Sequence, residues 1–233
     1  MADLCVIASS KPWNKDLPVT LHAATGQQFQ LISDPAKLAP EHLTRLKPRY
    51  VFFPHWSHRI PAEVFGNFEC VIFHMTDLPF GRGGSPLQNL IVRGIQETQI
   101  SALKCAEEVD AGPIYLKRPL SLHGSAEEIY VRASEIIEKM IVEIINTNPQ
   151  PMVQIGEPTF FKRRKPEQSN LLHAESLDQV FDLIRMLDAD GYPHAFINVG
   201  KFRMEFTRAG RKVDSISAEV KITRQDNKTE KDK

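Results

Sequence analysis

Short apolar segments recur through the first half of this chain and alternate with stretches of helical character. Each segment is four or five residues long, which suits a strand that is buried on both faces. Strands that alternate with helices predict an α/β domain with a mainly parallel sheet and helices on both of its faces. The segments are Leu4–Ala8, Gln28–Ile32, Tyr50–Phe53, Cys70–Phe73, Ser101–Cys105 and Pro113–Leu116.

The composition is that of an ordinary soluble globular protein, and its charge balance argues against a nucleic-acid substrate, although a local basic patch stays open. The 233 residues carry 29 basic and 29 acidic side chains, so no net charge would attract a nucleic acid. The sequence shows no signal peptide and no apolar window that could span a membrane, which predicts a cytoplasmic protein. Cys5, Cys70 and Cys105 lie in apolar segments without the spacing of metal ligands, so we expect buried thiols and no metal.

The middle of the chain predicts a long helix that closes the first domain. Ser125-Ala126-Glu127-Glu128 is a capping box, and apolar residues follow it at helical spacing to about Asn146. Asn148-Pro149-Gln150-Pro151 then breaks the pattern. We therefore assign residues 1–150 to the first domain.

The rest of the chain divides into a connector, a small subdomain and a tail. We interpret residues 151–168 as a connector that crosses the surface, 169–223 as a β-rich α+β subdomain, and 224–233 as a disordered polar tail. In the subdomain we expect a helix at Ser176–Leu187 and strands at Ala195–Val199, Phe202–Thr207 and Ser217–Ile222.

The segment Phe73–Pro79 contains the first candidate for a chemical group. His74 directly follows an apolar strand, and the carboxyl ends of parallel strands are where open α/β sheets place their active sites. Because side chains alternate along a strand, His74 shares a face with Ile72. The alternative is a histidine that only caps the strand or hydrogen-bonds a carbonyl group.

A second candidate lies in Val109-Asp110-Ala111-Gly112-Pro113, where an acid stands in a tight turn before another apolar strand. Taken alone, Asp110 is most simply a turn residue, because aspartate caps turns and tolerates unusual backbone angles.

Together the two segments resemble the signature of the N10-formyltetrahydrofolate-dependent formyltransferases. This group includes glycinamide ribonucleotide, methionyl-tRNA and nucleotide-amino-sugar formyltransferases. The resemblance covers most of residues 1–150 and implies a Rossmann-like domain that passes a formyl group from the folate to a primary amine. The matching residues are His74, Thr76, Leu78, Pro79, Arg82, Gly83, Pro86, Asp110 and Gly112.

The resemblance also implies roles for individual residues. His74 would act as general base on the attacking amine or stabilise the tetrahedral intermediate, and Asp110 would orient it. The family has an asparagine that polarises the formyl oxygen where this chain has Ile72, which cannot donate a hydrogen bond. We expect Asn89 to replace it, with Thr76, His58 or a backbone amide as the alternatives.

By the same resemblance, three segments would hold the folate co-substrate, N10-formyltetrahydrofolate. For two residues a simpler alternative stays open: Trp56 as a packing aromatic and Asp77 as a turn cap. The expected folate-binding residues are Trp56, Ser57, His58, Arg59, Thr76, Asp77, Leu78, Pro79, Ala106, Glu107, Glu108 and Val109.

Thr159–Pro166 and Gly191–Phe196 are similar to segments of nucleotide-sugar N-formyltransferases. Phe52–Ser57 and Phe73–Asp77 are similar to the pseudaminic-acid type and to formylation domains of peptide synthetases. The resemblance therefore implies that the acceptor is the amine of a nucleotide-linked amino-deoxysugar, with UDP-4-amino-4,6-dideoxy-AltNAc as the candidate. Basic side chains could pair with its diphosphate, although a charge run is as often a solvated linker. The expected substrate-binding residues are Lys162, Arg163, Arg164 and Tyr192.

Two other functions remain open. One is a formyltransferase acting on an aminoacyl group, either methionyl-tRNA or a carrier-bound residue. The other is a non-catalytic module that binds folate or a nucleotide sugar, which Ile72 suggests. For the main interpretation we expect no nucleic-acid partner, no membrane contact and a homodimer.

Overall fold

The computed structural model describes residues 2–225, and the first domain is built around a six-stranded sheet with the order β2-β1-β3-β4-β6-β7. Strands β1 to β4 run parallel, whereas β6 is antiparallel to β4 and β7 is antiparallel to β6. This confirms the predicted α/β class. The strands are β1 Leu4–Ala8, β2 Gln28–Ile32, β3 Tyr50–Phe53, β4 Cys70–His74, β6 Glu97–Lys104 and β7 Ile114–Ser121.

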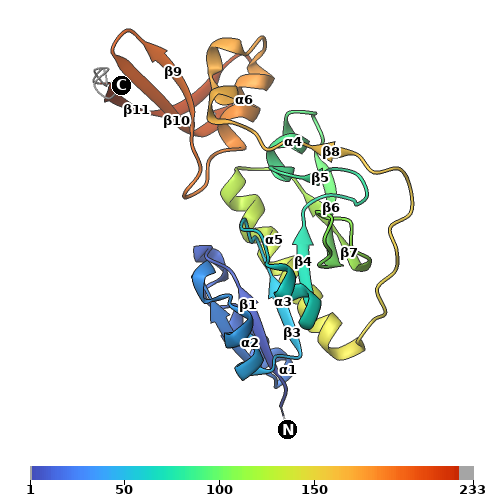
Figure 1. The fold of residues 1–233 in the computed structure, drawn as a ribbon. Helices are drawn as coiled ribbons and strands as arrows, with labels where there is room; N and C mark the ends of the chain where they lie inside the picture. Colours follow the sequence, from blue (N-terminus) through green and yellow to red (C-terminus); the bar gives the residue numbers. More distant parts are fainter. Residues whose placement is uncertain (1, 226–233) are drawn as a thin grey trace, which may run out of the picture.

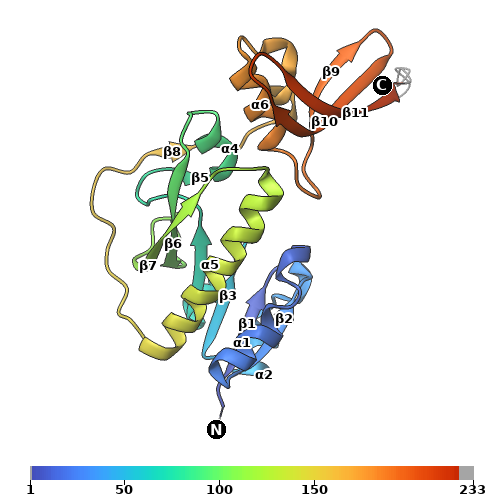
Figure 2. The same ribbon diagram turned by 180° about the vertical axis from the view of Figure 1, so that it is seen from behind.

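Alternate residues of the central strands fill two separate cores, one on each face of the sheet. In β1, Cys5 and Ile7 belong to the core beneath α1 and α5, while Val6 and Ala8 belong to the core beneath α2 and α3. Figures 1 and 2 show these two layers from opposite sides. Burial on both faces explains why the strand segments are apolar throughout. The helices are α1 Leu17–Thr25, α2 Pro40–Leu46, α3 Ala62–Asn67, α4 Pro86–Ile91 and α5 Ala126–Thr147.

Helix α5 begins at the predicted capping box. The Ser125 hydroxyl accepts the N–H of Glu128, and the Glu128 carboxylate accepts the N–H of Ser125. The helix ends at Thr147, where Asn148 adopts the left-handed conformation that commonly terminates helices.

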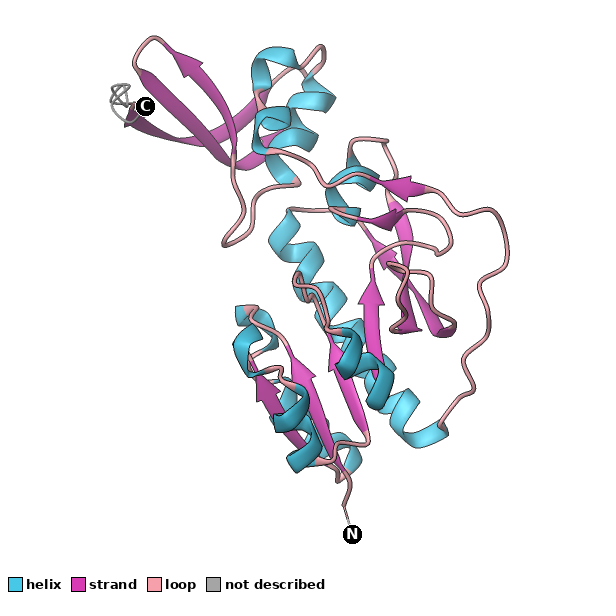
Figure 3. Cartoon of the chain, in the orientation of Figure 1, coloured by secondary structure: helices cyan, strands magenta, loops and turns pink. Residues whose placement is uncertain are grey.

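The chain after α5 follows the edge of the sheet and then packs on the loop behind β4 (Figure 3). Met152 exchanges two backbone hydrogen bonds with Ile114 at the start of β7, 2.7 and 2.9 Å long. Strand β8, Phe160–Phe161, pairs in parallel with β5, Arg82–Gly83. The connector backbone therefore pairs with strands of the first domain. The expectation that it only crosses the surface did not include this pairing.

The C-terminal unit is a three-stranded antiparallel sheet with one helix packed on it, as predicted. The strand order is β11-β10-β9, and Ile184 of α6 packs with Leu171 and Ala195 in a small core. No helix within residues 2–225 is both long and apolar enough to cross a membrane. Of the expected tail, residues 226–233 lie outside the described part. The elements are 3-10 helices at Pro166–Ser169 and Leu171–His173, α6 Leu177–Arg185, β9 Ala195–Val199, β10 Phe202–Arg211 and β11 Ile216–Arg224.

Candidate active site at the carboxyl end of β4

His74 is the last residue of β4, and both of its ring nitrogens face oxygen atoms. Nε2 lies 2.8 Å from the carbonyl oxygen of Gly81, and Nδ1 lies 3.4 Å from Oδ2 of Asp110. A carbonyl oxygen can only accept, so Nε2 carries a proton in this arrangement. The Asp110 carboxylate lies beside the other ring nitrogen. The ring is therefore held between the Gly81 carbonyl group and the Asp110 carboxylate.

The loop between β6 and β7 carries Asp110 back to His74. Asp110 has a φ of 55°, in the left-handed region, and its Oδ2 accepts the N–H of Gly83 at 2.9 Å. Two residues later a Cβ on Gly112 would lie 1.8 Å from the carbonyl oxygen of Lys104. Only glycine fits that position. This crowding explains why a glycine stands two residues after the aspartate.

Buried Arg82 and half-buried Gln154 form a polar pair beside this loop. The Nε and Nη2 groups of Arg82 donate to Oε1 of Gln154 at 3.1 and 2.8 Å, and its Nη1 lies 3.1 Å from Glu108. Nε2 of Gln154 donates to the carbonyl oxygens of Asp110 and Gly112. The sequence analysis did not single out Gln154, because it lies in a connector without regular structure.

The connector also fixes the glycine-rich loop behind β4. The N–H of Gly81 donates to Oγ1 of Thr159 at 2.8 Å. A Cβ on Gly83, which has a φ of 105°, would lie 2.5 Å from the carbonyl oxygen of Phe161. The glycines are needed here because the connector backbone approaches the loop so closely.

Asn89, expected to donate to a formyl oxygen, is bound to the protein itself. Its Nδ2 lies 3.0 Å from the carbonyl oxygens of Gly84 and Ser85 and 2.9 Å from that of Lys162. Its Oδ1 accepts from Arg93 at 3.1 Å. Three acceptors compete for two N–H hydrogens, so none remains for a ligand. The structure therefore argues against Asn89 as the replacement for the missing asparagine.

The four residues expected to contact folate behind β4 lie in different environments. They are Thr76, Asp77, Leu78 and Pro79. Thr76 and Leu78 are buried, and the Thr76 hydroxyl donates to the carbonyl oxygen of Gly81 at 3.4 Å. Exposed Asp77 pairs with Nζ of Lys117 at 2.5 Å. Pro79 follows a cis peptide bond, and its carbonyl oxygen accepts the N–H of Thr159 at 3.2 Å. The buried side chains of Thr76 and Leu78 thus serve the loop rather than a ligand surface.

The loop after β3 meets β4 at Trp56. This side chain is half-buried and packs edge-on against Phe53 at 6.0 Å and against His58 at 5.3 Å. It lies in the same core as Ile72 and Cys105, and its Nε1–H is closed to solvent without a partner. Ser57, His58 and Arg59 are exposed. The structure thus brings the Trp56 loop beside the position where the family has its asparagine.

The third expected folate segment, Ala106–Val109, lies next to Cys105. Glu107, Glu108 and Val109 are exposed, and their N–H groups make no hydrogen bond to any described part of the chain. These free N–H groups follow Cys105, which packs against the same core as Trp56, and they suit a planar heterocycle with acceptors on its edge. The residues present therefore fit a pterin ring.

The expected substrate residues do not converge on His74. Lys162 and Arg163 are exposed, whereas burial and the neighbouring Arg93 charge lower the pKa of half-buried Arg164. The ring of Tyr192, in the C-terminal unit, stacks on Tyr130 of α5 at 5.4 Å. The Tyr192 ring thus packs against other side chains of the protein.

An aromatic stack joins the C-terminal unit to the first domain. Tyr130 lies between Tyr192 and Trp13, with ring centroids 5.4 and 5.3 Å away. Nζ of Lys11 lies 5.5 Å from the Trp13 ring and 4.9 Å from the Tyr192 ring. Burial lowers the pKa of His55, which meets the edges of this stack, to about 3, and the Lys11 charge adds to the effect.

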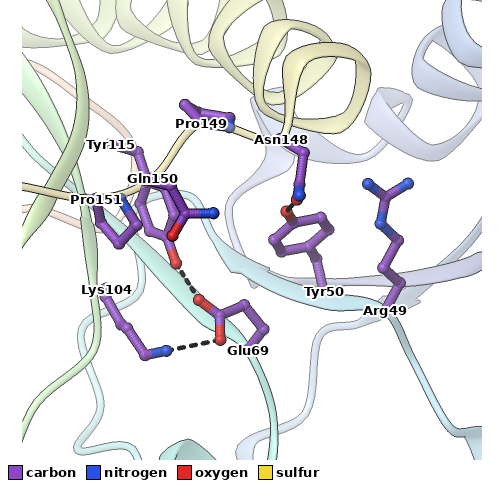
Figure 4. A pocket seen from close by; sticks show the side chains of 9 residues that line it. All are labelled: Arg49, Tyr50, Glu69, Lys104, Tyr115, Asn148, Pro149, Gln150 and Pro151. Atoms are coloured by element: carbon purple, nitrogen blue, oxygen red, sulfur yellow. Dashed lines mark hydrogen bonds and ion pairs between the residues drawn. The ribbon is translucent and has the colours of Figure 1, made fainter.

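A cavity of about 410 Å³ opens at the other end of the strands (Figure 4). Its charged groups are paired within the protein: Glu69 binds Nζ of Lys104 at 2.7 Å and the hydroxyl of Tyr115, and Arg49 pairs with Asp3. Burial and Glu69 raise the pKa of Tyr115. The cavity lies at the amino ends of β3 and β4, so it is separate from His74. Residues 2–225 contain no cluster of three side chains that could hold a metal ion.

Three comparisons with known proteins agree on one family. A family model described as "Methionyl-tRNA formyltransferase, C-terminal domain" matches residues 166–223. Methionyl-tRNA formyltransferase of Mycoplasma genitalium is 28% identical over 56% of this chain and 42% of its own length. That of Lysinibacillus sphaericus is 24% identical over 77% of this chain and 61% of its own length. The chain thus spans about half the length of the curated relatives it matches.

Among solved structures, a methionyl-tRNA formyltransferase from Clostridium thermocellum is 48% identical, with a TM-score of 0.92 over 95% of this chain and 99% of its own. HypX from Aquifex aeolicus in complex with tetrahydrofolic acid has a TM-score of 0.73 at 17% identity over 90% of this chain and 38% of its own. A sugar N-formyltransferase from Shewanella has a TM-score of 0.70 at 17% identity over 91% of this chain and 99% of its own. These last two share the fold only.

These findings overturn the expected acceptor. The expectation of a nucleotide-linked amino sugar, and of no nucleic-acid partner, is wrong, because the well-matched relatives are methionyl-tRNA formyltransferases by name. The expectation of no nucleic-acid partner rested on the zero net charge of the chain. The protein from C. thermocellum is covered to 99% by this chain, so a chain of this length does not exclude that class. Lys162, Arg163, Arg164 and Tyr192 lose the ligand expected for them.

Proposed function

Because the chain belongs to the N10-formyltetrahydrofolate-dependent formyltransferase family, we propose that it transfers a formyl group to the amino group of an aminoacyl ester, with methionyl-tRNA as the acceptor. One observation carries the choice of acceptor: the 48% identity to the C. thermocellum protein extends over nearly the whole of both chains. The family match to residues 166–223 points the same way.

The co-substrate of this family is N10-formyltetrahydrofolate, which supplies the activated formyl group. The Trp56 loop and the free N–H groups of Glu107, Glu108 and Val109 would hold its pterin, since these segments follow β3 and β6, the strands that pair with β4 on either side of Ile72. The neighbouring HypX structure with tetrahydrofolic acid shares the fold. A site on exposed loops at the carboxyl ends of parallel strands is common in α/β sheets.

His74 would stabilise the negative charge that develops on the formyl oxygen when the amine attacks. Its Nε2 holds a proton toward the Gly81 carbonyl oxygen, and the Asp110 carboxylate lies beside Nδ1 and orients the ring. Ile72 cannot donate, and the amide of Asn89 and the hydroxyl of Thr76 are engaged within the protein. Of the two roles that the resemblance allows, a proton on Nε2 supports the oxyanion donor better than the general base, with the formyl oxygen taking the place of the Gly81 carbonyl.

The direct test combines the protein with N10-formyltetrahydrofolate and charged methionyl-tRNA. After hydrolysis of the ester, mass spectrometry should find formylmethionine, and uncharged tRNA should give none. A parallel arm offers methionine as a carrier-bound thioester. If only the thioester is formylated, the acceptor is a carrier-bound aminoacyl group and not methionyl-tRNA. If neither acceptor is formylated, the proposal is wrong.

The second candidate is a folate-binding module without transferase activity. It is favoured by one observation, namely that Ile72 stands where the family has its asparagine and that Asn89 does not replace it. Calorimetry that shows tetrahydrofolate binding, together with no product from any acceptor, would support this function instead.

A further inference from the structure

We propose that Gln154 is a positioning residue of the candidate active site. From the connector it holds the backbone around Asp110 and the guanidinium of Arg82 in one arrangement, and it thereby fixes the carboxylate that faces His74. The proposal rests on the proposed function, because it concerns the reaction that His74 and Asp110 would carry out.

The amide of Gln154 uses its full hydrogen-bonding capacity within the site. Nε2 donates to the carbonyl oxygens of Asp110 and Gly112, both at 2.8 Å. Oε1 accepts from Nε and Nη2 of Arg82 at 3.1 and 2.8 Å. Among long side chains only an amide can donate twice and accept twice, since a carboxylate only accepts and an ammonium only donates. The position therefore calls for glutamine.

Asp110 depends on this contact because its backbone is unusual. Its φ of 55° lies in a region that residues other than glycine seldom adopt. Its carboxylate meets the N–H of Gly83 at 2.9 Å and Nδ1 of His74 at 3.4 Å, so a small rotation of the backbone would move it away from both. Gln154 fixes that backbone at residues 110 and 112.

Arg82 depends on Gln154 because its other charged partner is largely in water. Arg82 is 8% exposed, whereas the Glu108 side chain is 67% exposed and the ion pair between them is screened. The two hydrogen bonds to Gln154 thus satisfy most of a buried guanidinium. Arg82 directly precedes Gly83, whose N–H reaches Asp110. The Gln154 amide therefore acts on the Asp110 carboxylate from two sides. Its Nε2 holds the Asp110 backbone, and its Oε1 holds Arg82, which precedes Gly83.

The connector is fastened on either side of Gln154. Met152 is hydrogen-bonded to Ile114 in both directions, and Oγ1 of Thr159 accepts the N–H of Gly81. Figure 3 shows this segment as a loop beside the sheet. These contacts fix the connector backbone on both sides of Gln154, so the Gln154 side chain is held in place against Asp110 and Arg82.

The test compares Gln154→Met with Gln150→Met. Methionine has a similar length and removes all four hydrogen bonds. Gln150 is an exposed glutamine directly before the connector and lines the cavity at the far end of the strands, so its variant controls for the substitution. Gln154→Met should lower kcat roughly 10- to 100-fold, as displaced catalytic groups do, with KM changed less than threefold. Gln150→Met should retain wild-type kcat.

Gln154→Glu separates the two ends of the amide. The carboxylate can still accept from Arg82, but it places an acceptor against the carbonyl oxygens of Asp110 and Gly112. We expect this variant to keep the fold through its pair with Arg82 and to lose kcat as Gln154→Met does. Wild-type kcat in Gln154→Glu would overturn the proposal.

A double-variant cycle with Asp110→Asn decides whether Gln154 acts through Asp110. In that background Gln154→Met should change kcat less than twofold, since the carboxylate it positions is gone. An equal loss of kcat in both backgrounds would mean that Gln154 serves only the fold, and would overturn the proposal.

An NMR measurement keeps this test independent of turnover. The ring signals of His74 should shift in Gln154→Met, because the carboxylate beside Nδ1 moves, and should stay unchanged in Gln150→Met. If the wild-type protein transfers no formyl group while these signals shift as expected, the proposed function fails and the positioning role stands. Unchanged His74 signals in Gln154→Met would overturn the positioning role.

Discussion

His74 donates its Nε2–H to the carbonyl oxygen of Gly81, 2.8 Å away, so the ring nitrogen that points away from Asp110 is already engaged. A substrate oxygen that uses this N–H has to replace the Gly81 carbonyl. Gly81 is itself tied to Thr159 of the connector. Access to His74 is thus linked to the chain that follows α5.

Removal of His74 or of the Asp110 charge should abolish most turnover. We expect His74→Ala and Asp110→Asn to lower kcat by about 10²–10⁴-fold, the usual contribution of such groups, with folate affinity changed by no more than a few-fold. Steady-state kinetics and calorimetry measure the two quantities. If His74→Ala retained wild-type kcat, the site would lie elsewhere.

Gly112→Ala should displace the loop that carries Asp110. The added methyl group would lie 1.8 Å from the carbonyl oxygen of Lys104, so the backbone has to move. We expect a lower Tm and at least a tenfold loss of kcat. Gly66→Ala, in α3 with nothing within 4 Å of the added atom, should leave kcat unchanged and Tm unchanged or slightly raised. A fully active Gly112→Ala would contradict the crowding at this loop.

Asn89→Ala should cost stability rather than catalysis. The side chain satisfies three carbonyl oxygens, two in its own loop and one in the connector, and their loss should lower the free energy of unfolding by about 1–3 kcal/mol. Urea denaturation measures the free energy of unfolding. The kcat of the variant, measured at a temperature well below its Tm, should change only a few-fold. A loss of kcat of about 10²–10³-fold at unchanged stability would restore Asn89 as the oxyanion donor.

If tRNA is the acceptor, the exposed cations of the connector should contribute to its binding. We expect the KM for methionyl-tRNA to rise steeply with salt, and Lys162→Ala combined with Arg163→Ala to reduce that dependence by about one phosphate contact each. Lys37→Ala, beyond β2 at the far edge of the sheet, is the matched control. A salt-independent KM would argue for a small acceptor.

His55 should make the protein less stable in acid. Its pKa is about 3 in the folded protein and 6.5 as the ordinary value, so the unfolded chain binds one more proton between these pH values. The contribution of His55 to the free energy of unfolding is therefore full above pH 6.5. It falls as the pH drops toward 3, by up to about 1.4 kcal/mol per pH unit. Denaturation at pH 7.5 and pH 5 should show a smaller difference for His55→Asn than for the wild type, and an equal difference would contradict the assignment.

The sequence could predict the sheet because buried strands follow a local pattern, whereas the pairing of His74 with Asp110 was implied only by the resemblance to the formyltransferases. Buried strands are apolar along their whole length, and the turn that holds Asp110 needs glycine two residues later. Gln154 could not be found this way, because its partners lie 42 and 44 residues earlier and no periodicity marks a loop. Asn89 looked available for a ligand because one of its three carbonyl partners, that of Lys162, reaches it only once the connector is folded back.

The acceptor illustrates a different limit. Charge and length describe a whole unit, whereas recognition of a substrate depends on where individual cations lie on its surface. Lys162 and Arg163 are exposed beside the site even though the whole chain has no net charge. A neutral total therefore excludes neither a small anion nor a nucleic acid.

The stack of Trp13, Tyr130 and Tyr192 has a mechanical consequence for the molecule. Rotation of the C-terminal unit against the sheet has to separate Tyr192 from a ring that belongs to the longest helix of the first domain. An acceptor bound to the C-terminal unit would thus be held in one orientation relative to the sheet. Its reactive amine would then stay at one position at the edge of the sheet.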